Sequence, residues 1–231
     1  MAIYQFNKMM EAQKIKLLSI LVFFFSLLIV FAFRNYVVLL MVPALMVWWL
    51  CDHYPAKKLP VVVSIYGICL VVFFIAPYLS ASLDFPGYIV TKQLEFRSLE
   101  GNSQIALPAL LPNITSFIRF LPNAIDIAVL RPHINELTNP AYWPSILENI
   151  FLYSWLLFVI LKVVIKPPKE KPGLFPINGF IIFCYCFAIS FLLLTGYTVT
   201  LTAAIVRYRG FVLPLIFAPL ALVLRGKHYK L

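Results

Sequence analysis

Two arginines, Arg207 and Arg209, lie inside the run "LTAAIVRYRGFVLPLIFAPLALVL", which is otherwise almost entirely apolar. An unpaired arginine in hydrocarbon is costly, so the pair must lie at an interface, meet a partner or bind a ligand. Two guanidinium groups can hold a phosphate or pyrophosphate through charge-assisted bidentate hydrogen bonds, for which arginine is better shaped than lysine. The alternative is that both side chains reach lipid phosphates at a membrane surface, with Tyr208 as an interfacial aromatic residue.

A second group of polar residues occurs in "RPHINELTNPAYWPSILENIFLYSW". We expect these residues to border a polar pocket at the outer end of the helix that follows; they are Arg131, His133, Glu136 and Glu148. Glu148 has a structural alternative, because Ser145 and Glu148 have the spacing of a capping box. His133 is either a general base or a hydrogen-bonded loop residue. No second ligand lies near it at metal-binding spacing, so we predict no metal and no cofactor.

The composition indicates the kind of environment in which these residues act. Of the 231 residues, 62% are hydrophobic and only 12% are charged, and the mean hydropathy is +0.92. These values are typical of a polytopic membrane protein. The formal net charge is +10, but the basic residues cluster between apolar runs, as helix-flanking charges do, and we expect no nucleic-acid partner. The four cysteines lie in or beside apolar runs and indicate small hydrophobic residues rather than a disulfide framework.

Six apolar runs predict an all-α membrane helix bundle, with about six transmembrane helices in one integral membrane domain, 1–231. The runs are 17–33, 36–51, 60–82, 147–165, 174–196 and 208–224. The first run is long enough to span a bilayer and has no small-residue cleavage pattern after it, so we interpret it as a retained helix. The last run places Arg207 and Arg209 just before a helix that begins near Gly210.

The distribution of basic residues predicts the orientation. With a cytoplasmic N-terminus, twelve Lys or Arg lie inside, if Lys162 is counted, and the other seven of the 19 lie outside. This obeys the positive-inside rule. We therefore expect both termini in the cytoplasm of a bacterial cell, the protein in its inner membrane, and the long segment 83–146 on the outer side.

Segment 83–146 contains an internal repeat, "LPNITSFIRF" at 111–120 and "LPNAIDIAVL" at 121–130. In each copy the asparagine can cap a helix start, and Asp126 follows Asn123 at capping-box spacing. The pattern predicts two short helices separated near Pro122 and lying on the outer membrane surface. The alternative is that these helices fill a gap between spanning helices.

The stretches "LPNAIDIAVLRP", "WPSILENIFLYSWLLF" and "AAIVRYRGFVLPLIFAPLAL" resemble the C-terminal portion of polytopic inner-membrane proteins of bacterial surface-polysaccharide clusters. That group is similar to oligosaccharide polymerases and membrane-embedded glycosyltransferases. The resemblance covers about residues 111–224. It implies work on a glycan carried by polyprenyl phosphate or pyrophosphate at the outer face. The residues to which it transfers are Arg131, Pro132, Glu148, Asn149, Arg207, Tyr208 and Arg209.

Three functions remain open from the sequence. The first is binding or processing of a lipid-linked glycan, with membrane lipid and other membrane proteins as partners. The second is a non-catalytic subunit of a larger membrane complex. The third, a small transporter, ranks last because no charged residue lies in the middle of a predicted span and no inverted repeat is visible. The catalytic residues are not identified, and the candidate phosphate or glycan ligands are Arg131, His133, Glu148, Arg207, Tyr208 and Arg209.

Overall fold

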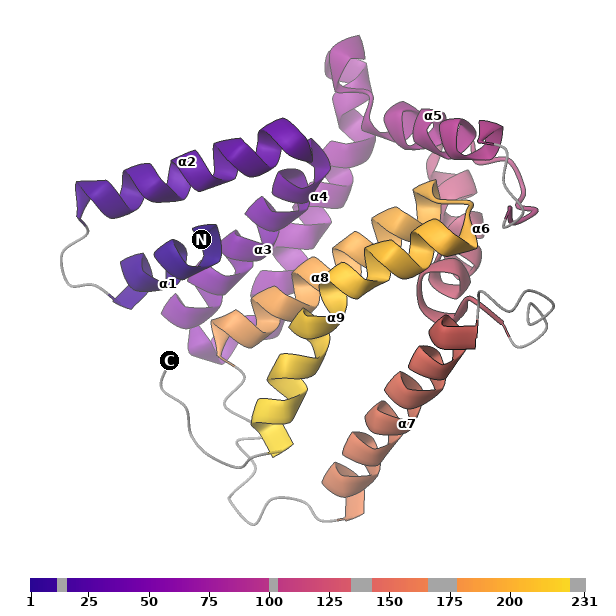
Figure 1. Cartoon of the computed structure of the whole chain (residues 1–231). Helices are drawn as coiled ribbons and strands as arrows, with labels where there is room; N and C mark the ends of the chain where they lie inside the picture. Colours follow the sequence, from indigo (N-terminus) through magenta and orange to yellow (C-terminus); the bar gives the residue numbers. More distant parts are fainter. Residues whose placement is uncertain (12–15, 100–103, 134–142, 166–177, 225–231) are drawn as a thin grey trace. The chain divides into compact units, whose positions relative to one another are not determined.

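The computed structural model describes residues 1–11, 16–99, 104–133, 143–165 and 178–224, and this part of the chain is helical (Figure 1). Each of the six predicted apolar runs is helical over most of its described residues, which confirms the all-α fold for this part of the chain. These helices are α2 (Leu17–Phe33), α3 (Asn35–His53), α4 (Lys58–Leu79), α7 (Trp143–Ile165), α8 (Gly179–Thr198) and α9 (Thr202–Leu224). Glu136 lies outside the described residues.

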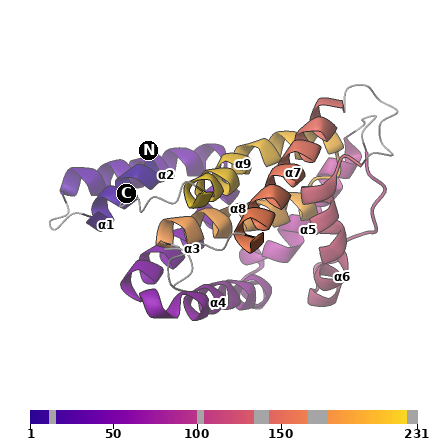
Figure 2. The same cartoon turned by 90° about the horizontal axis from the view of Figure 1, so that it is seen from below.

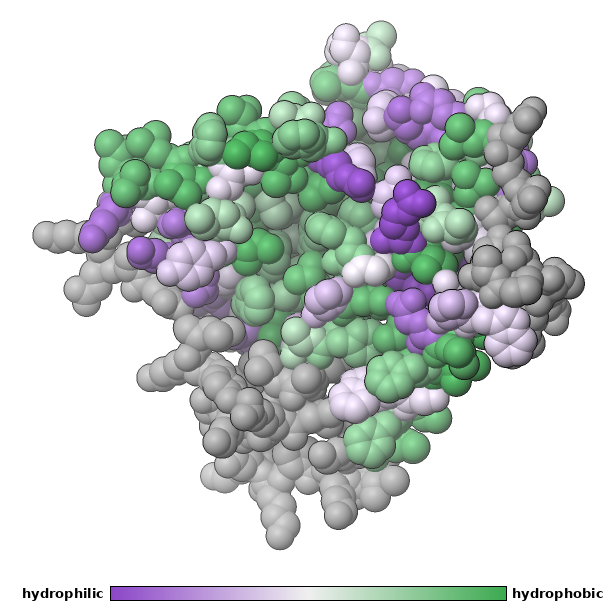
Figure 3. All heavy atoms as spheres, in the orientation of Figure 1, coloured by the Kyte–Doolittle hydropathy of each residue, from purple (hydrophilic) through white to green (hydrophobic). Residues whose placement is uncertain are grey.

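Among the described residues, three helices are long and apolar enough to cross a membrane, namely α3, the segment Pro55–Leu79 that contains α4, and α8. The Pro55–Leu79 segment is the most apolar of them, yet only 6% of its most apolar stretch is buried within the protein. The 17-residue α2 is also apolar, and the face of it that Figure 3 shows is mostly hydrophobic. Such surfaces are stable against lipid rather than water, so the chain is a membrane-associated helical protein. Six spans remain a prediction.

The first of two compact units comprises Met1–Gly67 and Asn178–Phe187. In it, α1 (Ala2–Glu11) lies along α2 (Figure 1). Trp48 is the aromatic centre, and its ring contacts those of Phe6, Phe180 and Phe183. A side chain on Gly179 would collide with Trp48, so α8 can approach α3 this closely only with glycine there.

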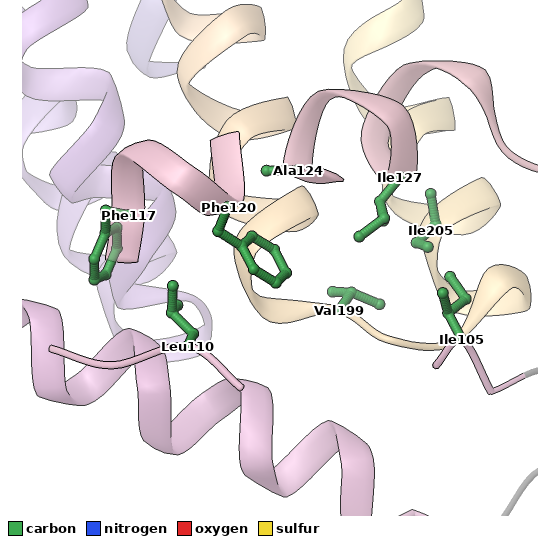
Figure 4. Close-up of a cluster of buried hydrophobic side chains, with 8 residues drawn as sticks. All are labelled: Ile105, Leu110, Phe117, Phe120, Ala124, Ile127, Val199 and Ile205. Carbon is green, nitrogen blue, oxygen red and sulfur yellow. The ribbon is translucent and has the colours of Figure 1, made fainter. Parts of the chain in front are cut away.

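The second unit comprises Ile68–Ile177 and Ala188–Leu231. Its apolar cluster joins the 104–110 loop, α6 (Ile114–Ile125) and the start of α9 (Figure 4). The buried members of the cluster are Ile105, Leu110, Phe117, Phe120, Ala124, Ile127, Val199 and Ile205. Gly196 of α8 packs directly on the backbone of Ala124, because an added Cβ would lie 2.0 Å from the Ala124 carbonyl oxygen. This contact holds α8 against the end of α6.

The repeat within 111–130 forms one helical segment instead of two helices. The first cap is confirmed: Asn113 Oδ1 accepts a hydrogen bond from Ser116 N–H at 2.8 Å. The break near Pro122 is wrong, because α6 continues through Pro122 and encloses Asn123, which therefore caps nothing. Proline removes one ladder hydrogen bond, but the helix face that contains Phe117, Phe120 and Ala124 is buried and keeps the segment helical.

The segment then changes to a π-helical turn, η3 (Asp126–Leu130), in which Arg131 N–H bonds the Asp126 carbonyl at 3.2 Å. Segment 83–146 also contains α5 (Phe85–Ser98), which begins after Asp84. One stripe of α6 exposes large apolar residues at helical spacing, and these are Ile114, Ile118, Leu121 and Ile125. An interfacial position of these helices on the outer membrane surface stays a prediction.

Two predicted helix starts need correction. The capping box at Ser145 and Glu148 is wrong because α7 already includes Trp143, which places Ser145 inside the helix. The final helix begins at Thr202 and not near Gly210: Ala204 N–H and Ile205 N–H both bond the Leu201 carbonyl, at 3.0 and 3.1 Å. Gly210 lies inside α9, where an added Cβ would meet nothing within 4 Å. Arg207 and Arg209 therefore lie within a helix.

Candidate functional site

The candidate site is built around the end of the π-helical turn in the second unit. A helix leaves its last carbonyl groups without partners in the helix, and these carbonyls need donors from elsewhere. At the end of the turn, the carbonyls that need such donors include those of Val129, Leu130 and Arg131. Side chains from α7 and α9 bond all three of them. Figure 2 shows α7 passing beside α9, and both α7 and the turn contact α9.

Arg209 lies in the middle of the buried face of α9. Ile205 and Val212 are fully buried, and Arg209 between them is only 4% exposed. Its Nη1 donates to the carbonyls of Val129 at 3.2 Å and Arg131 at 3.0 Å. The negative end of the helix dipole at this turn favours a nearby cation. These two hydrogen bonds and the dipole offset part of the cost of burying an arginine on an apolar helix face.

Arg207 is exposed and lies on a different face of α9. Two positions separated by two residues on a helix point about 200° apart. The two arginines therefore do not form the paired clamp that their closeness in sequence indicates. Tyr208, the third residue of this predicted group, is half-buried and packs against the apolar cluster.

Helix α7 contributes two polar side chains to the same turn. Asn149 is 4% exposed, and its Nδ2 donates to the carbonyls of Leu130 at 3.5 Å and Arg131 at 3.3 Å. The Tyr153 hydroxyl donates to the carbonyl of Val129. Arg209 of α9 and Asn149 of α7 therefore donate to the same carbonyl oxygen, that of Arg131, which brings the two side chains together.

The remaining predicted residues lie at the edge of this site. The carboxylate of Asp126 lies 3.5 Å from Arg131 Nε and 3.2 Å from His133 Nε2. Glu148 is half-buried and interacts electrostatically with the Arg209 guanidinium. The structure thus gathers Arg131, His133, Glu148 and Arg209 around one turn and leaves Arg207 outside. The roles of these residues as ligands stay predictions.

Within the residues that the structure describes, three polar atoms at the centre are buried and have no hydrogen-bond partner: Arg209 Nε, Arg209 Nη2 and Asn149 Oδ1. In the described part of the chain, no ion pair includes Arg209. Nε and Nη2 form one edge of the guanidinium, the edge that binds two oxygens of a carboxylate or phosphate side by side. The charge is desolvated, and the helix dipole offsets only part of that cost. The site therefore has donors available for an anion.

Sequence reasoning missed two contributors, Asp126 as the partner of His133 and Tyr153 as a donor, and it reached Asn149 only through the resemblance. A weak signal existed for Asn149, which interrupts the apolar run that follows Ser145. Among the described residues, no three His, Cys, Asp or Glu side chains are grouped as metal ligands would be.

No protein-family model matches this chain, and neither does any curated protein or solved structure.

Proposed function

We propose that this chain is an integral membrane protein that binds the phosphate group of a polyprenyl-phosphate-linked glycan at the outer face of the bacterial inner membrane, during surface-polysaccharide assembly. The observation that carries the proposal is the unpaired Nε and Nη2 edge of the buried Arg209. A phosphate satisfies both donors and neutralises the desolvated charge.

The surroundings of Arg209 favour a membrane-anchored ligand over a soluble one. The guanidinium lies on a helix of 23 residues that is mostly apolar apart from Arg207 and Arg209. A ligand that reaches this group is most stable if its own tail lies in lipid. The stretches with Leu-Arg-Pro, Leu-Glu-Asn and Arg-Tyr-Arg, which resemble proteins of polysaccharide clusters, meet at this turn and support a glycan on the phosphate.

Each candidate residue has a distinct place in this proposal. Arg209 holds the phosphate, while Arg131, His133 and Glu148 lie at the edge, where the sugar would extend. Arg207 stays at the exposed surface of α9 and contacts lipid headgroups, while Tyr208 packs against the apolar cluster. The proposal assigns no reaction and no catalytic residue.

Binding can be measured with the full chain in phosphatidylcholine nanodiscs and a fluorescent isoprenyl phosphate. Arg209→Lys keeps the charge but loses the planar fork, so we expect it to weaken binding about tenfold or more. Arg207→Lys is the matched control, since it makes the same change on the exposed face of the same helix, and should bind like the wild type. Equal binding by a folded Arg209→Lys variant contradicts the proposal.

The orientation is part of the proposal and has its own test. A cysteine-free background carrying Lys57→Cys should react with an impermeant reagent only from the cytoplasmic side, because that residue lies in the basic connection before α4. Ser98→Cys, at the end of α5, should react only from the outer side. Reversed labelling of this pair overturns the outer-face assignment.

A second candidate function is a non-catalytic subunit of a membrane complex. It is favoured by the fact that Arg209 Nη1 already bonds two carbonyls and so contributes to the structure. In that case wild-type protein in nanodiscs binds no isoprenyl phosphate, and α2 and α4, which expose long apolar faces, cross-link to other membrane proteins in cells.

A further inference from the structure

Asn149 and Arg209 meet at a single atom. Both donate to the carbonyl oxygen of Arg131, Asn149 from Nδ2 at 3.3 Å and Arg209 from Nη1 at 3.0 Å. The two nitrogens can be no farther apart than the sum of these distances. The head groups of these two side chains therefore lie side by side, and both are about as buried as the surrounding apolar core.

The orientation of the Asn149 amide follows from its partners. Its NH2 group faces two carbonyl oxygens, those of Leu130 and Arg131. Turning the amide over would place Oδ1 against both oxygens, where it has no hydrogen to share. Oδ1 is therefore the atom left over, and it is a buried acceptor without a donor.

The unsatisfied atoms thus consist of two donors on one edge of Arg209 and one acceptor on the neighbouring Asn149. Phosphate oxygens satisfy the two donors, but an oxygen beside Asn149 Oδ1 would repel it. A ligand that satisfies all three atoms presents anionic oxygens and, next to them, a hydroxyl donor.

Building on the proposed phosphate site, we infer that its ligand is a glycosyl phosphate whose sugar carries a hydroxyl beside the phosphate-bearing carbon, and that Asn149 Oδ1 accepts a hydrogen bond from this hydroxyl. The site then distinguishes a lipid phosphate that carries sugar from one that does not. Bare isoprenyl phosphate, largely ionised at neutral pH, leaves Oδ1 unpaired. A buried polar group left without its partner is the strongest form of discrimination that a binding site has.

The test compares ligands on the unaltered protein, so it does not depend on a variant that folds. Full-length chain in phosphatidylcholine nanodiscs is titrated with three probes: an isoprenyl phosphoglycoside, its deoxy analogue without the adjacent hydroxyl, and isoprenyl phosphate. We expect the hydroxyl-bearing probe to bind on the order of tenfold more tightly than the deoxy probe. Equal affinities overturn the inference and leave the phosphate site standing, whereas failure of all three probes removes the proposed function itself.

A variant series assigns the discrimination to Asn149. Asn149→Leu should bring the affinities of the hydroxyl and deoxy probes together while Arg209 still holds the phosphate. Gln93→Leu is the matched control, because Gln93 is another buried amide of the same unit and donates to the Tyr197 carbonyl, away from the site. Gln93→Leu should keep the difference between probes. Retained discrimination in a folded Asn149→Leu variant overturns the role of Asn149.

Phosphatidylglycerol also carries hydroxyls near a phosphate. It therefore tests whether the ligand is a phosphoglycoside or a phospholipid headgroup. As a competitor in the same nanodiscs it should displace the phosphoglycoside weakly. Competition as strong as that of the phosphoglycoside itself overturns the sugar assignment and identifies the site as one for a phospholipid headgroup.

Discussion

In each unit a charged side chain connects two helical segments: Asp52 in the first unit and Arg209 in the second. Asp52 is exposed, yet both of its oxygens are used: Oδ2 accepts from Trp48 Nε1 at 2.9 Å and Oδ1 from Gly179 N–H at 2.8 Å. Arg209 is buried, yet two of its three nitrogens have no hydrogen-bond partner among the described residues. Solvation alone favours the opposite, because buried polar groups are normally hydrogen-bonded within the protein and exposed ones can bond water.

This difference distinguishes a charged group whose hydrogen bonds are all used within the fold from one that still has donors available for a ligand. Solvent can reach Asp52, so an unused oxygen there would have little cost, and complete pairing indicates that the carboxylate serves to connect α3 with α8. Unpaired donors on Arg209 have no access to water and are costly. A folded chain tolerates that cost where a ligand removes it, which is why we place function in the second unit.

We expect the largest effect from a substitution that displaces α6, because α6 leads into the turn that Arg209 contacts. Gly196→Ala places a Cβ 2.0 Å from the Ala124 carbonyl oxygen, so α6 must move away from α8. We expect a loss of about 3 kcal/mol in stability, read as a lower thermal midpoint in detergent. Binding of the isoprenyl phosphoglycoside should fall as well, because Ala124 leads directly into the 126–130 turn. Gly210→Ala, which meets nothing within 4 Å, is the control, and a similar loss there would contradict the packing explanation.

Removing the Asp52 carboxylate tests whether its connection between α3 and α8 has only a structural role. Asp52→Ala leaves Trp48 Nε1 and the Gly179 N–H without their acceptor, and we expect a loss of about 2 kcal/mol. Thermal unfolding measures the loss, and phosphoglycoside binding below the unfolding temperature should match that of the wild type. A binding defect in this folded variant would mean that the first unit also contributes to the site.

Much of the fold follows from the sequence, because long apolar runs in this composition can only be helices. The arrangement of the candidate site is less predictable from the sequence. Arg207 and Arg209 were paired on the expectation that the last helix begins near Gly210; once α9 includes them, a spacing of two residues places them on different faces. The helix break at Pro122 was also wrong, because burial of the face containing Phe117 and Phe120 outweighed one lost hydrogen bond. Tertiary contacts of this kind are not visible in a local pattern.

Tyr153→Phe should give the smallest effect. The change removes only the hydroxyl that donates to the Val129 carbonyl, and the side chain is 38% exposed, so water can replace the bond in part. We expect a loss of about 1 kcal/mol or less in thermal unfolding and nearly unchanged affinity for the phosphoglycoside. Loss of binding comparable to that of Arg209→Lys would place Tyr153 in contact with the ligand.

An experimental structure of the chain in a lipid nanodisc with bound isoprenyl phosphoglycoside tests the central claim most directly. The account predicts phosphate oxygens within hydrogen-bond distance of Arg209 Nε and Nη2, and none beside Arg207. A structure in which the ligand lies elsewhere, while an acidic side chain or ordered water satisfies both nitrogens of Arg209, would contradict it.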